Sequence, residues 1–240
     1  MREMMSRTVI YEWLGRQPYR AVWEYQQRLL EQRVAGEIGD RLLLVEHLPT
    51  YTLGKSGDQN HLLAGDDELT ENHIDFVPID RGGDITYHGP GQLVGYPILH
   101  LEDYRRDVHW YIRQLEEAII QTIADYGITG SRDPEYTGVW VNDEKIAAIG
   151  VKVSRWVTMH GFALNVTTDL SYFGRIIPCG IFHKDVCSIR SLTRHSPILR
   201  EVWQVFVHKF EQVFQCTVLP AVSPESDDHQ PQIASDRISL

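Results

Sequence analysis

The chain has 240 residues, of which 42% are hydrophobic and 10% aromatic, so it is long and apolar enough for one domain with a substantial core. Its formal net charge of −10 disfavours a general nucleic-acid surface, because neutralising phosphates requires clustered Lys and Arg. The N-terminus has no apolar signal segment, and no apolar run reaches membrane-spanning length. The three cysteines form no Cys-x-x-Cys pair, which argues against a secreted disulfide framework. We therefore expect a soluble, cytoplasmic protein.

The first part of the chain predicts a strand, a helix, a second strand and a loop. Thr8 to Leu14 is rich in β-forming residues, and Pro18 can open a helix with one apolar face formed by Val22, Tyr25, Leu29 and Val34. Arg41 to His47 is a short apolar run that is typical of a buried strand. Pro49 to Gly65 is polar and rich in turn residues, which predicts a mobile loop that covers a site.

The middle of the chain predicts two strands and the clearest helix. Phe76 to Asp80 and Leu93 to Leu99 have the composition of strands. Val108 to Tyr126 has helical spacing of its apolar residues Ile112, Leu115, Ile119 and Ile123. Gly127 is a natural C-terminal stop for this helix.

The last part of the chain predicts a hairpin, a strand and a helix. Val139 to Val141 and Lys145 to Val153 are β-like runs joined by a turn, and Phe162 to Val166 is a further strand. Ser196 and Pro197 are typical of a helix start, and the helix that follows carries Val202, Phe206, Phe210 and Val213.

These elements predict a single α/β domain of the α+β type over residues 1–219, with a mixed, largely antiparallel sheet and helices on one side of it. Residues 220–240 are polar and have too little apolar surface to offset the entropy of ordering, so we expect a disordered tail.

One stretch, Arg81 to Gln92, contains four glycines and a proline together with Arg81 and His88. Glycines this dense indicate positive φ angles or a backbone that closely approaches another molecule. The composition fits two interpretations, a long surface turn or a ligand-binding loop in which Arg81 and His88 supply hydrogen-bond donors.

Cys179 is the strongest candidate for a nucleophile, because Pro178 and Gly180 place its thiol in a turn. Most free cysteines are buried hydrophobic residues, which is the interpretation that fits Cys216. A thiol with an ordinary pKa of about 8.5 also needs a neighbouring cation or base, for which Lys145 and His88 are candidates. Two alternatives remain: a redox pair of Cys179 with Cys187, or a zinc site. The zinc site matches no common ligand spacing and would use Cys179, His183, Cys187 and His195.

Two further segments have small residues beside a polar one. Lys145 precedes Ile146 to Gly150, a run with few large side chains that leaves room for a ligand. His160 precedes Gly161 to Ala163 in the same manner, and we interpret His160 as a hydrogen-bonded structural histidine or a substrate contact.

Taken together, Arg81 to Gln92, Lys145 to Gly150, His160 to Ala163 and Pro178 to Ile181 closely resemble the motifs of the lipoyl(octanoyl) transferases. The resemblance runs from about Tyr19 to Leu192. It also includes the segment from Glu46 to Gly54 and a pattern near the N-terminus made of Tyr19, Ala21, Trp23 and Gln26.

The resemblance implies a biotin/lipoate ligase-like fold and transfer of octanoyl from octanoyl-acyl carrier protein to a lysine of lipoyl domains, without ATP or another cofactor and without a metal. The acceptors would be lipoyl domains of 2-oxoacid dehydrogenase E2 subunits and the glycine cleavage H protein. Cys179 would form the acyl-thioester and Lys145 would lower its pKa. The implied substrate-binding residues are Arg81, Gly82, Gly83, Asp84, Ile85, Thr86, Tyr87, His88, Ala148, Ile149, Gly150, Gly161, Phe162 and Ala163.

The chain departs from the family pattern after Cys179, where Asp185 to Ser188 replaces a Gly-Val-Thr-Ser-like segment and puts the local loop shape in doubt. An ATP-dependent lipoate or biotin ligase and a non-catalytic module that holds carrier domains are the alternative functions. Docking of an acidic carrier would need a basic patch, for which we expect Arg105, Arg106, Lys152 or Arg155.

Overall fold

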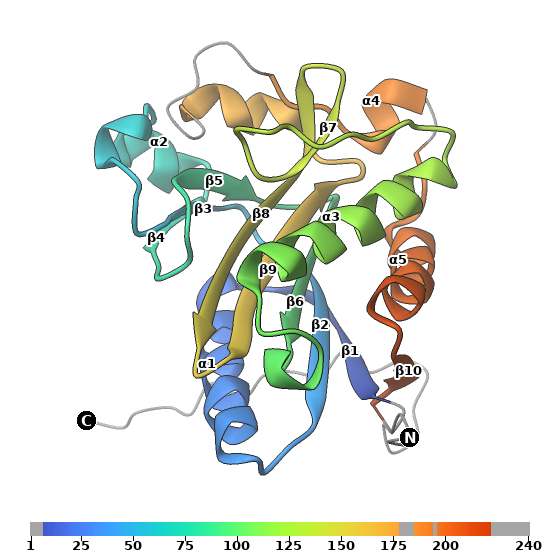
Figure 1. The fold of residues 1–240 in the computed structure, drawn as a ribbon. Helices are drawn as coiled ribbons and strands as arrows, with labels where there is room; N and C mark the ends of the chain where they lie inside the picture. The colour runs from blue at the N-terminus through green and yellow to red at the C-terminus, as the bar shows by residue number, and fades with distance from the viewer. Residues whose placement is uncertain (1–6, 178–184, 194–195, 222–240) are drawn as a thin grey trace, which may run out of the picture.

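The computed structural model describes residues 7–177, 185–193 and 196–221. A mixed seven-stranded sheet forms the centre of the molecule (Figure 1). Its order is β10 (Thr217–Pro220), β1 (Thr8–Gln17), β2 (Asp40–His47), β6 (Gln92–Ile98), β9 (Val157–Asn165), β8 (Glu144–Ser154) and β7 (Val139–Val141). The first three strands are parallel and every later pairing is antiparallel, so the predicted mixed, largely antiparallel sheet is confirmed.

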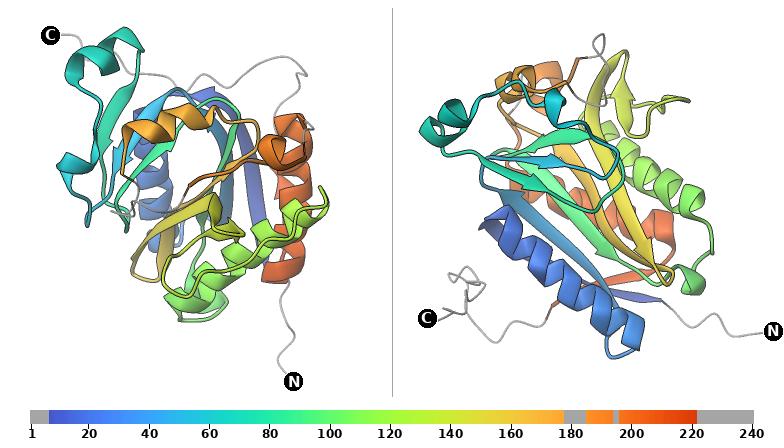
Figure 2. Two further views of the ribbon diagram at one scale, coloured as in Figure 1. Left: turned by 90° about the horizontal axis from the view of Figure 1, so that it is seen from above. Right: turned by 90° about the vertical axis from the view of Figure 1, so that its left-hand side faces the viewer.

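Helices cover both faces of this sheet, which corrects the expectation that they lie on one side (Figure 2). One face packs on α3 (Val108–Ala124) and α5 (Leu199–Phe214), and the other packs on α1 (Tyr19–Ala35). Alternate residues of β2 explain the arrangement, because Leu42 and Leu44 face α3 and α5 whereas Leu43 and Val45 face α1. A strand buried on both faces therefore has a continuous apolar sequence.

A second sheet of three strands stands beside the first and contains β4 (Asp75–Pro78), β3 (Thr50–Leu53) and β5 (Ile85–His88) in that order. The interpretation of residues 49–65 as one mobile loop was wrong, because all four residues of β3 are buried. The stretch from Arg81 to Gln92 likewise contains a strand, β5, and residues 79–84 form the connection from β4, which we call the glycine loop.

Short helices complete the described chain: α2 (Asp66–Glu71), α4 (Ile189–Thr193), and 3₁₀ turns at Gln59–His61, Leu101–Asp103 and Leu170–Arg175. The predicted hairpin of β7 and β8 and the helices α1 and α3 are confirmed to within two residues at most ends. Strand β1 continues three residues beyond its predicted end, through a bulge in which Gly15 has a φ of 69°. Helix α5 begins after Ile198 rather than at Ser196, so that predicted cap was wrong.

No helix in the described ranges is long and apolar enough to cross a membrane. Strand β10 was not predicted, and it pairs with β1 up to Tyr11 and Pro220. The predicted disordered tail falls largely on residues 222–240, which lie outside the described residues.

Candidate active site

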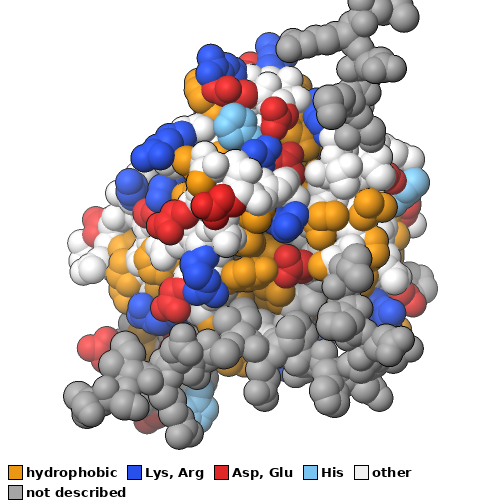
Figure 3. All heavy atoms as spheres, turned by 90° about the horizontal axis from the view of Figure 1, so that it is seen from below, with side chains coloured by type: hydrophobic (Ala, Val, Ile, Leu, Met, Phe, Trp, Pro, Cys, Tyr) orange, Lys and Arg blue, Asp and Glu red, His pale blue; other side chains and the backbone are white. Residues whose placement is uncertain are grey.

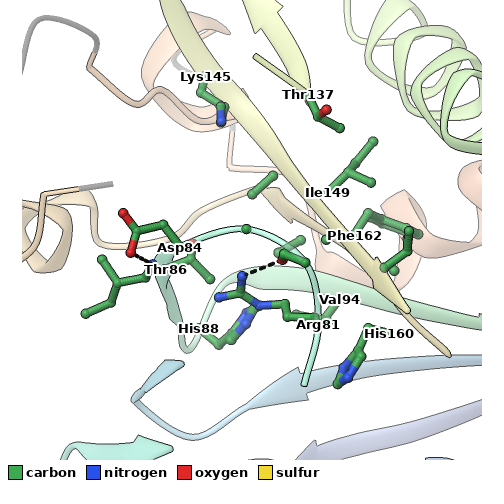
Figure 4. Close-up of a pocket in the computed structure, with 18 of the residues that line it drawn as sticks. Arg81, Asp84, Thr86, His88, Val94, Thr137, Lys145, Ile149, His160 and Phe162 are labelled. Atoms are coloured by element: carbon green, nitrogen blue, oxygen red, sulfur yellow. Dashed lines mark hydrogen bonds between the residues drawn. The ribbon is translucent and has the colours of Figure 1, made fainter. Parts of the chain in front are cut away.

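A cavity of about 440 Å³ brings together three of the predicted segments and Lys145 (Figure 4). Lys145 and Thr137 stand at one end, and Arg81, His88 and His160 stand at the other. The predicted substrate-binding residues that line the cavity are Arg81, Gly82, Gly83, Asp84, Ile85, Thr86, His88, Ala148, Ile149, Gly150, Gly161, Phe162 and Ala163. The cavity thus joins predicted positions from Arg81 to Ala163, which lie about eighty residues apart in the chain.

Tyr87 is the predicted substrate-binding residue that does not line the cavity. Its side chain is buried in the small sheet, where its ring stacks on Tyr172 with centroids 4.6 Å apart and lies 5.5 Å from Tyr51. Alternate residues of β5 point to opposite faces, so Thr86 and His88 reach the cavity while Tyr87 packs behind the strand. Ile85 packs in the same cluster as Tyr87 but also lines the cavity at the start of the strand.

Gly150 allows the glycine loop to lie directly against β8. A Cβ atom at this position would stand 2.9 Å from both the Gly82 carbonyl oxygen and Cδ of Arg81. The loop is fixed there by the Gly82 N–H, which donates to the Val151 carbonyl at 3.0 Å. This N–H is therefore already used in the fold, and an oxyanion donor from the loop would have to be a different group.

Arg81 holds the glycine loop to the small sheet from a nearly buried position. Its guanidinium donates to the carbonyl and to Oγ1 of Thr52, each at 2.9 Å, and to the Gly82 carbonyl at 3.1 Å. A planar group with five donors suits this task, because it can bond several oxygens at once.

Asp84 is tied to His61, whose Nδ1 lies 2.5 Å from Oδ2 of the carboxylate. Oδ1 of Asp84 accepts from the Ile85 N–H at 2.7 Å. The His61 carbonyl in turn accepts from the N–H of Ile177 at 2.8 Å. One wall of the cavity is thereby connected to the chain just before Pro178.

Lys145 lies near the start of β8, with Nζ 4.7 Å from the centroid of the Trp140 ring, a distance suited to a cation–π contact. The Lys145 N–H donates to the Asp185 carbonyl at 2.9 Å, and the Cys187 N–H donates to the Lys145 carbonyl at 3.1 Å. The unusual segment from Asp185 to Ser188 thus adds a short parallel bridge to β8 at Val186.

Cys179, the predicted nucleophile, lies outside the described residues. The described chain ends before it at Ile177 and resumes after it at Asp185, and both of these residues hydrogen-bond to parts of the site described above. The role of Cys179 therefore stays a prediction from the sequence.

The two thiols in the described ranges are poor nucleophiles. Cys187 and Cys216 are buried, and burial raises the pKa of each thiol to about 12. Cys216 packs in the core as predicted. Of the zinc alternative, Cys187 is the only described member, and no group of three or more His, Cys, Asp or Glu within residues 7–177, 185–193 and 196–221 is placed to hold a metal ion.

His88 is buried beside Tyr19 and His47, and its ring stacks on Tyr19 with centroids 5.3 Å apart. Burial, and then the nearby His47, lower the pKa of His88 well below its ordinary value. A neutral imidazole supplies no cation for a thiolate. Of the two candidates that the sequence offered for activating Cys179, this leaves Lys145 as the candidate cation.

His47 makes the stability of the protein depend on pH, and we expect the free energy of unfolding to rise between pH 5 and pH 7. Burial lowers the pKa of His47 to about 4, so below pH 6.5 the unfolded chain binds the extra proton. This histidine alone should make the protein about 2 kcal/mol less stable at pH 5 than at pH 7. Urea unfolding of His47→Gln should show a weaker pH dependence than wild type, whereas His109→Gln, at an exposed position, should not; equal slopes in all three proteins would contradict the expectation.

His160 is a hydrogen-bonded histidine, as one of its two interpretations expected. Its Nε2 lies 2.8 Å from Oδ1 of Asp80, whose other oxygen accepts from Nζ of Lys152 at 2.5 Å. Burial lowers the pKa of His160, while His160 and then Lys152 hold the pKa of Asp80 well below its usual range. The backbone of His160 has a φ of 59°, unusual for a non-glycine residue, and its N–H donates to Oε1 of Gln26 at 3.0 Å.

The expected basic patch is largely neutralised by carboxylates. Arg105 pairs with Asp107, Arg106 pairs with Glu102, and Lys152 pairs with Asp80. Figure 3 shows Lys and Arg side chains interspersed with Asp and Glu on the face seen from below. Paired charges of this kind produce no large field of one sign.

Sequence reasoning missed three polar residues at the site, of which Gln92 and Asn165 line the cavity and Thr52 binds Arg81. Thr52, Gln92 and Asn165 are at most 4% exposed and all hydrogen-bonded to other side chains, yet none was assigned a role. A polar residue within a buried apolar strand indicates a specific hydrogen-bonding role, and Asn165 at the end of β9 is such a residue.

Comparisons with known proteins agree with these motifs. The sequence model of the lipoyl protein ligase A/B catalytic domain matches residues 18–211. An octanoyltransferase of Solibacter usitatus is 54% identical over 210 residues, covering 88% of this chain and 94% of the relative. An octanoyltransferase of Flavobacterium psychrophilum is 47% identical over 232 residues, covering 90% of this chain and 100% of the relative.

Solved structures show the fold. A protein of T. acidophilum, described as a lipoate protein ligase and solved with lipoic acid bound, has a TM-score of 0.74 at 15% identity, covering 92% of this chain and 91% of that one. A biotin protein ligase from Aquifex aeolicus has a TM-score of 0.55 at 14% identity, covering 86% of this chain and 70% of that one. The expected biotin/lipoate ligase-like fold is therefore confirmed.

Proposed function

The chain belongs to the lipoyl protein ligase A/B catalytic domain family and is an acyltransferase, and from this premise we propose that it moves octanoyl from octanoyl-acyl carrier protein to a lysine of a lipoyl domain. The observation that carries the proposal is the single cavity that joins the glycine loop, residues 148–150, residues 161–163 and Lys145. The named activity of the relatives supports octanoyl as the group that is moved.

The first half-reaction loads the enzyme. The thiolate of Cys179 attacks the thioester carbonyl of the donor, so a bond forms between carbon and the Cys179 sulfur and the bond to the carrier sulfur breaks. The carrier thiolate takes a proton from the Lys145 ammonium and leaves as a thiol. One thioester replaces another, so the step is close to neutral in energy and needs no separate activation.

The second half-reaction forms the amide. The ε-amine of the acceptor lysine attacks the octanoyl-Cys179 carbonyl, a carbon–nitrogen bond forms, and the bond to the Cys179 sulfur breaks. Lys145, neutral after the first step, takes the proton of the amine, which restores the thiolate and ammonium pair. Forming an amide from a thioester is downhill and drives the transfer.

The octanoyl tail would lie against the small and apolar residues of the cavity, Ala148, Phe162 and Ala163 among them. Burying its seven carbons beyond the carbonyl at about 0.8 kcal/mol each would contribute about 5 to 6 kcal/mol of binding free energy. Side chains larger than Ala at positions 148 and 163 would occupy the space that the tail needs.

The acceptors in this proposal are lipoyl domains, as in 2-oxoacid dehydrogenase E2 subunits and the glycine cleavage H protein. The name of the family supports a lipoyl-domain acceptor. The proposal does not use ATP, which separates it from a ligase on the same fold.

We expect the purified protein to transfer octanoyl from octanoyl-acyl carrier protein to a lipoyl domain in the presence of EDTA and without ATP. The product is read as the mass of one octanoyl group on the lipoyl domain. The matched reaction contains free octanoate, ATP and Mg²⁺ instead of the thioester donor. Product in that reaction alone would contradict the proposal and identify an ATP-dependent ligase.

A further inference from the structure

In the wall of the cavity, Gln92 holds His88 in one tautomer. Nδ1 of His88 lies 2.9 Å from Oε1 of Gln92, and this oxygen can only accept, so the proton of the imidazole is on Nδ1. The orientation of the Gln92 amide is fixed in turn, because its Nε2 lies 3.1 Å from the carbonyl of Tyr87, which also can only accept. Nε2 of His88 is left as the acceptor.

The free nitrogen of His88 faces the residue that holds Arg81. Nε2 of His88 lies 3.4 Å from Oγ1 of Thr52, the hydroxyl that accepts from Arg81 at 2.9 Å. The Thr52 hydroxyl proton is therefore directed at His88. Each group thus donates to the next one in the series: the Arg81 guanidinium to the Thr52 hydroxyl, this hydroxyl to the His88 imidazole, and the imidazole to the Gln92 amide.

Asn165 continues this chain to the backbone of Lys145. The second proton of Gln92 Nε2 is donated to Oδ1 of Asn165 at 3.0 Å, and Nδ2 of Asn165 donates to the Cys187 carbonyl at 3.1 Å. The Cys187 N–H donates to the Lys145 carbonyl at 3.1 Å. Cys187, Gln92 and Asn165 are all at most 4% exposed, so a bond broken here would not be replaced by bulk water.

We propose that Gln92 and Asn165 are positioning residues, of which Gln92 holds His88 with its proton on Nδ1 and Asn165 fixes the backbone of Lys145 relative to the glycine loop. The inference rests on the proposed octanoyl transfer, in which Lys145 moves a proton in each half-reaction and the glycine loop lines the same cavity. Both residues also line the cavity, but this role requires no contact with the substrate.

Asn165→Leu tests the connection to Lys145, because it removes both amide groups and keeps a similar volume. We expect kcat to fall on the order of 10²-fold with little change in KM for the carrier, as is usual when a reacting group is displaced by about 1 Å. The Cys187 amide should exchange with solvent faster than in wild type, a readout by NMR that does not require activity.

Gln92→Leu tests whether Gln92 holds His88 with its proton on Nδ1. Without the acceptor on Nδ1, the ¹⁵N shifts of the His88 ring should change from those of a single Nδ1–H tautomer, whereas in Asn165→Leu the His88 signals should stay as in wild type. Gln92→Leu also removes the hydrogen bond to Asn165, so the unchanged His88 signals of Asn165→Leu are what separate the two roles.

Thr158→Val is the matched control, since Thr158 is a fully buried residue of the same strand whose hydroxyl bonds Pro97 and Leu99 outside the site. It should lose stability but keep kcat and Cys187 exchange near the wild-type values. Folded Asn165→Leu protein that matches this control in both respects would overturn the proposal. If wild type itself transfers no octanoyl, the proposed function fails, while the exchange and ¹⁵N measurements still test the positioning.

Discussion

Cys179→Ala is expected to abolish the octanoyl adduct and to lower transfer to a lipoyl domain by more than about 10³-fold, because no other thiol of the chain is suited to replace it. Wild-type protein incubated with octanoyl-acyl carrier protein should gain the mass of one octanoyl group, and the variant should gain none. The other two cysteines are buried, and burial raises the pKa of each to about 12.

Cys216→Ala is the control for this experiment, since Cys216 packs in the core beside α5. It should form the adduct as wild type does. Wild-type protein that transfers octanoyl without ever carrying it would exclude a covalent intermediate and require direct attack by the acceptor lysine. An adduct that survives in Cys179→Ala would assign the nucleophile to a different residue.

Lys145→Ala is expected to raise the pH at which Cys179 reacts with iodoacetamide. An ammonium about 4 Å from a thiolate, at an effective dielectric near 20, contributes about 4 kcal/mol before desolvation, or about three pKa units at most. The sign follows from the charge, because removing the cation disfavours the thiolate and raises the pKa of the thiol. The rate of alkylation against pH, read by intact mass, measures the shift.

Lys145→Arg separates the two roles assigned to Lys145. Arginine keeps the positive charge but does not lose its proton in proteins, so the alkylation profile should stay near that of wild type while the amide-forming step fails. Octanoyl-enzyme should then accumulate, because the carrier can leave as a thiolate without a proton from residue 145, whereas the attacking amine must lose a proton. Lys209→Ala, which removes a lysine of α5 that pairs with Asp125 directly after α3, should behave as wild type in both assays. An unchanged alkylation profile in Lys145→Ala would remove Lys145 from its proposed role.

The structure explains some residues of the predicted motifs and places others away from the cavity. The glycine-rich stretch was readable because four glycines in twelve residues are uncommon in regular elements, and the structure shows why Gly150 must be small where β8 meets the loop. Tyr87 was assigned to the cavity by its position in a motif, yet it packs in the small sheet. A motif identifies a segment, whereas the pleat of β5 determines which of its side chains reach the cavity.

The elements that were misread share a cause. β3 has only four residues and lies among Pro, Gly and Ser, so its local composition indicates a loop. It is a strand because β4 and β5 pair with it on both sides, at Tyr51 with Phe76 and Tyr87. β10 is equally short and depends on pairing with β1. Pairing partners distant in sequence leave little trace in the sequence of either strand.

By itself, the sequence determined the family, the α/β class, the long helices and the identity of the chemical groups, because periodicity, glycine density and motif residues are local properties. Only the tertiary structure decided that helices cover both sheet faces, that His88 is neutral, and that Thr52, Gln92 and Asn165 connect Arg81 to the backbone of Lys145. Burial and hydrogen-bond direction arise from segments that meet in space. They set the charge of His88 and the position of Lys145, and no local pattern contains them.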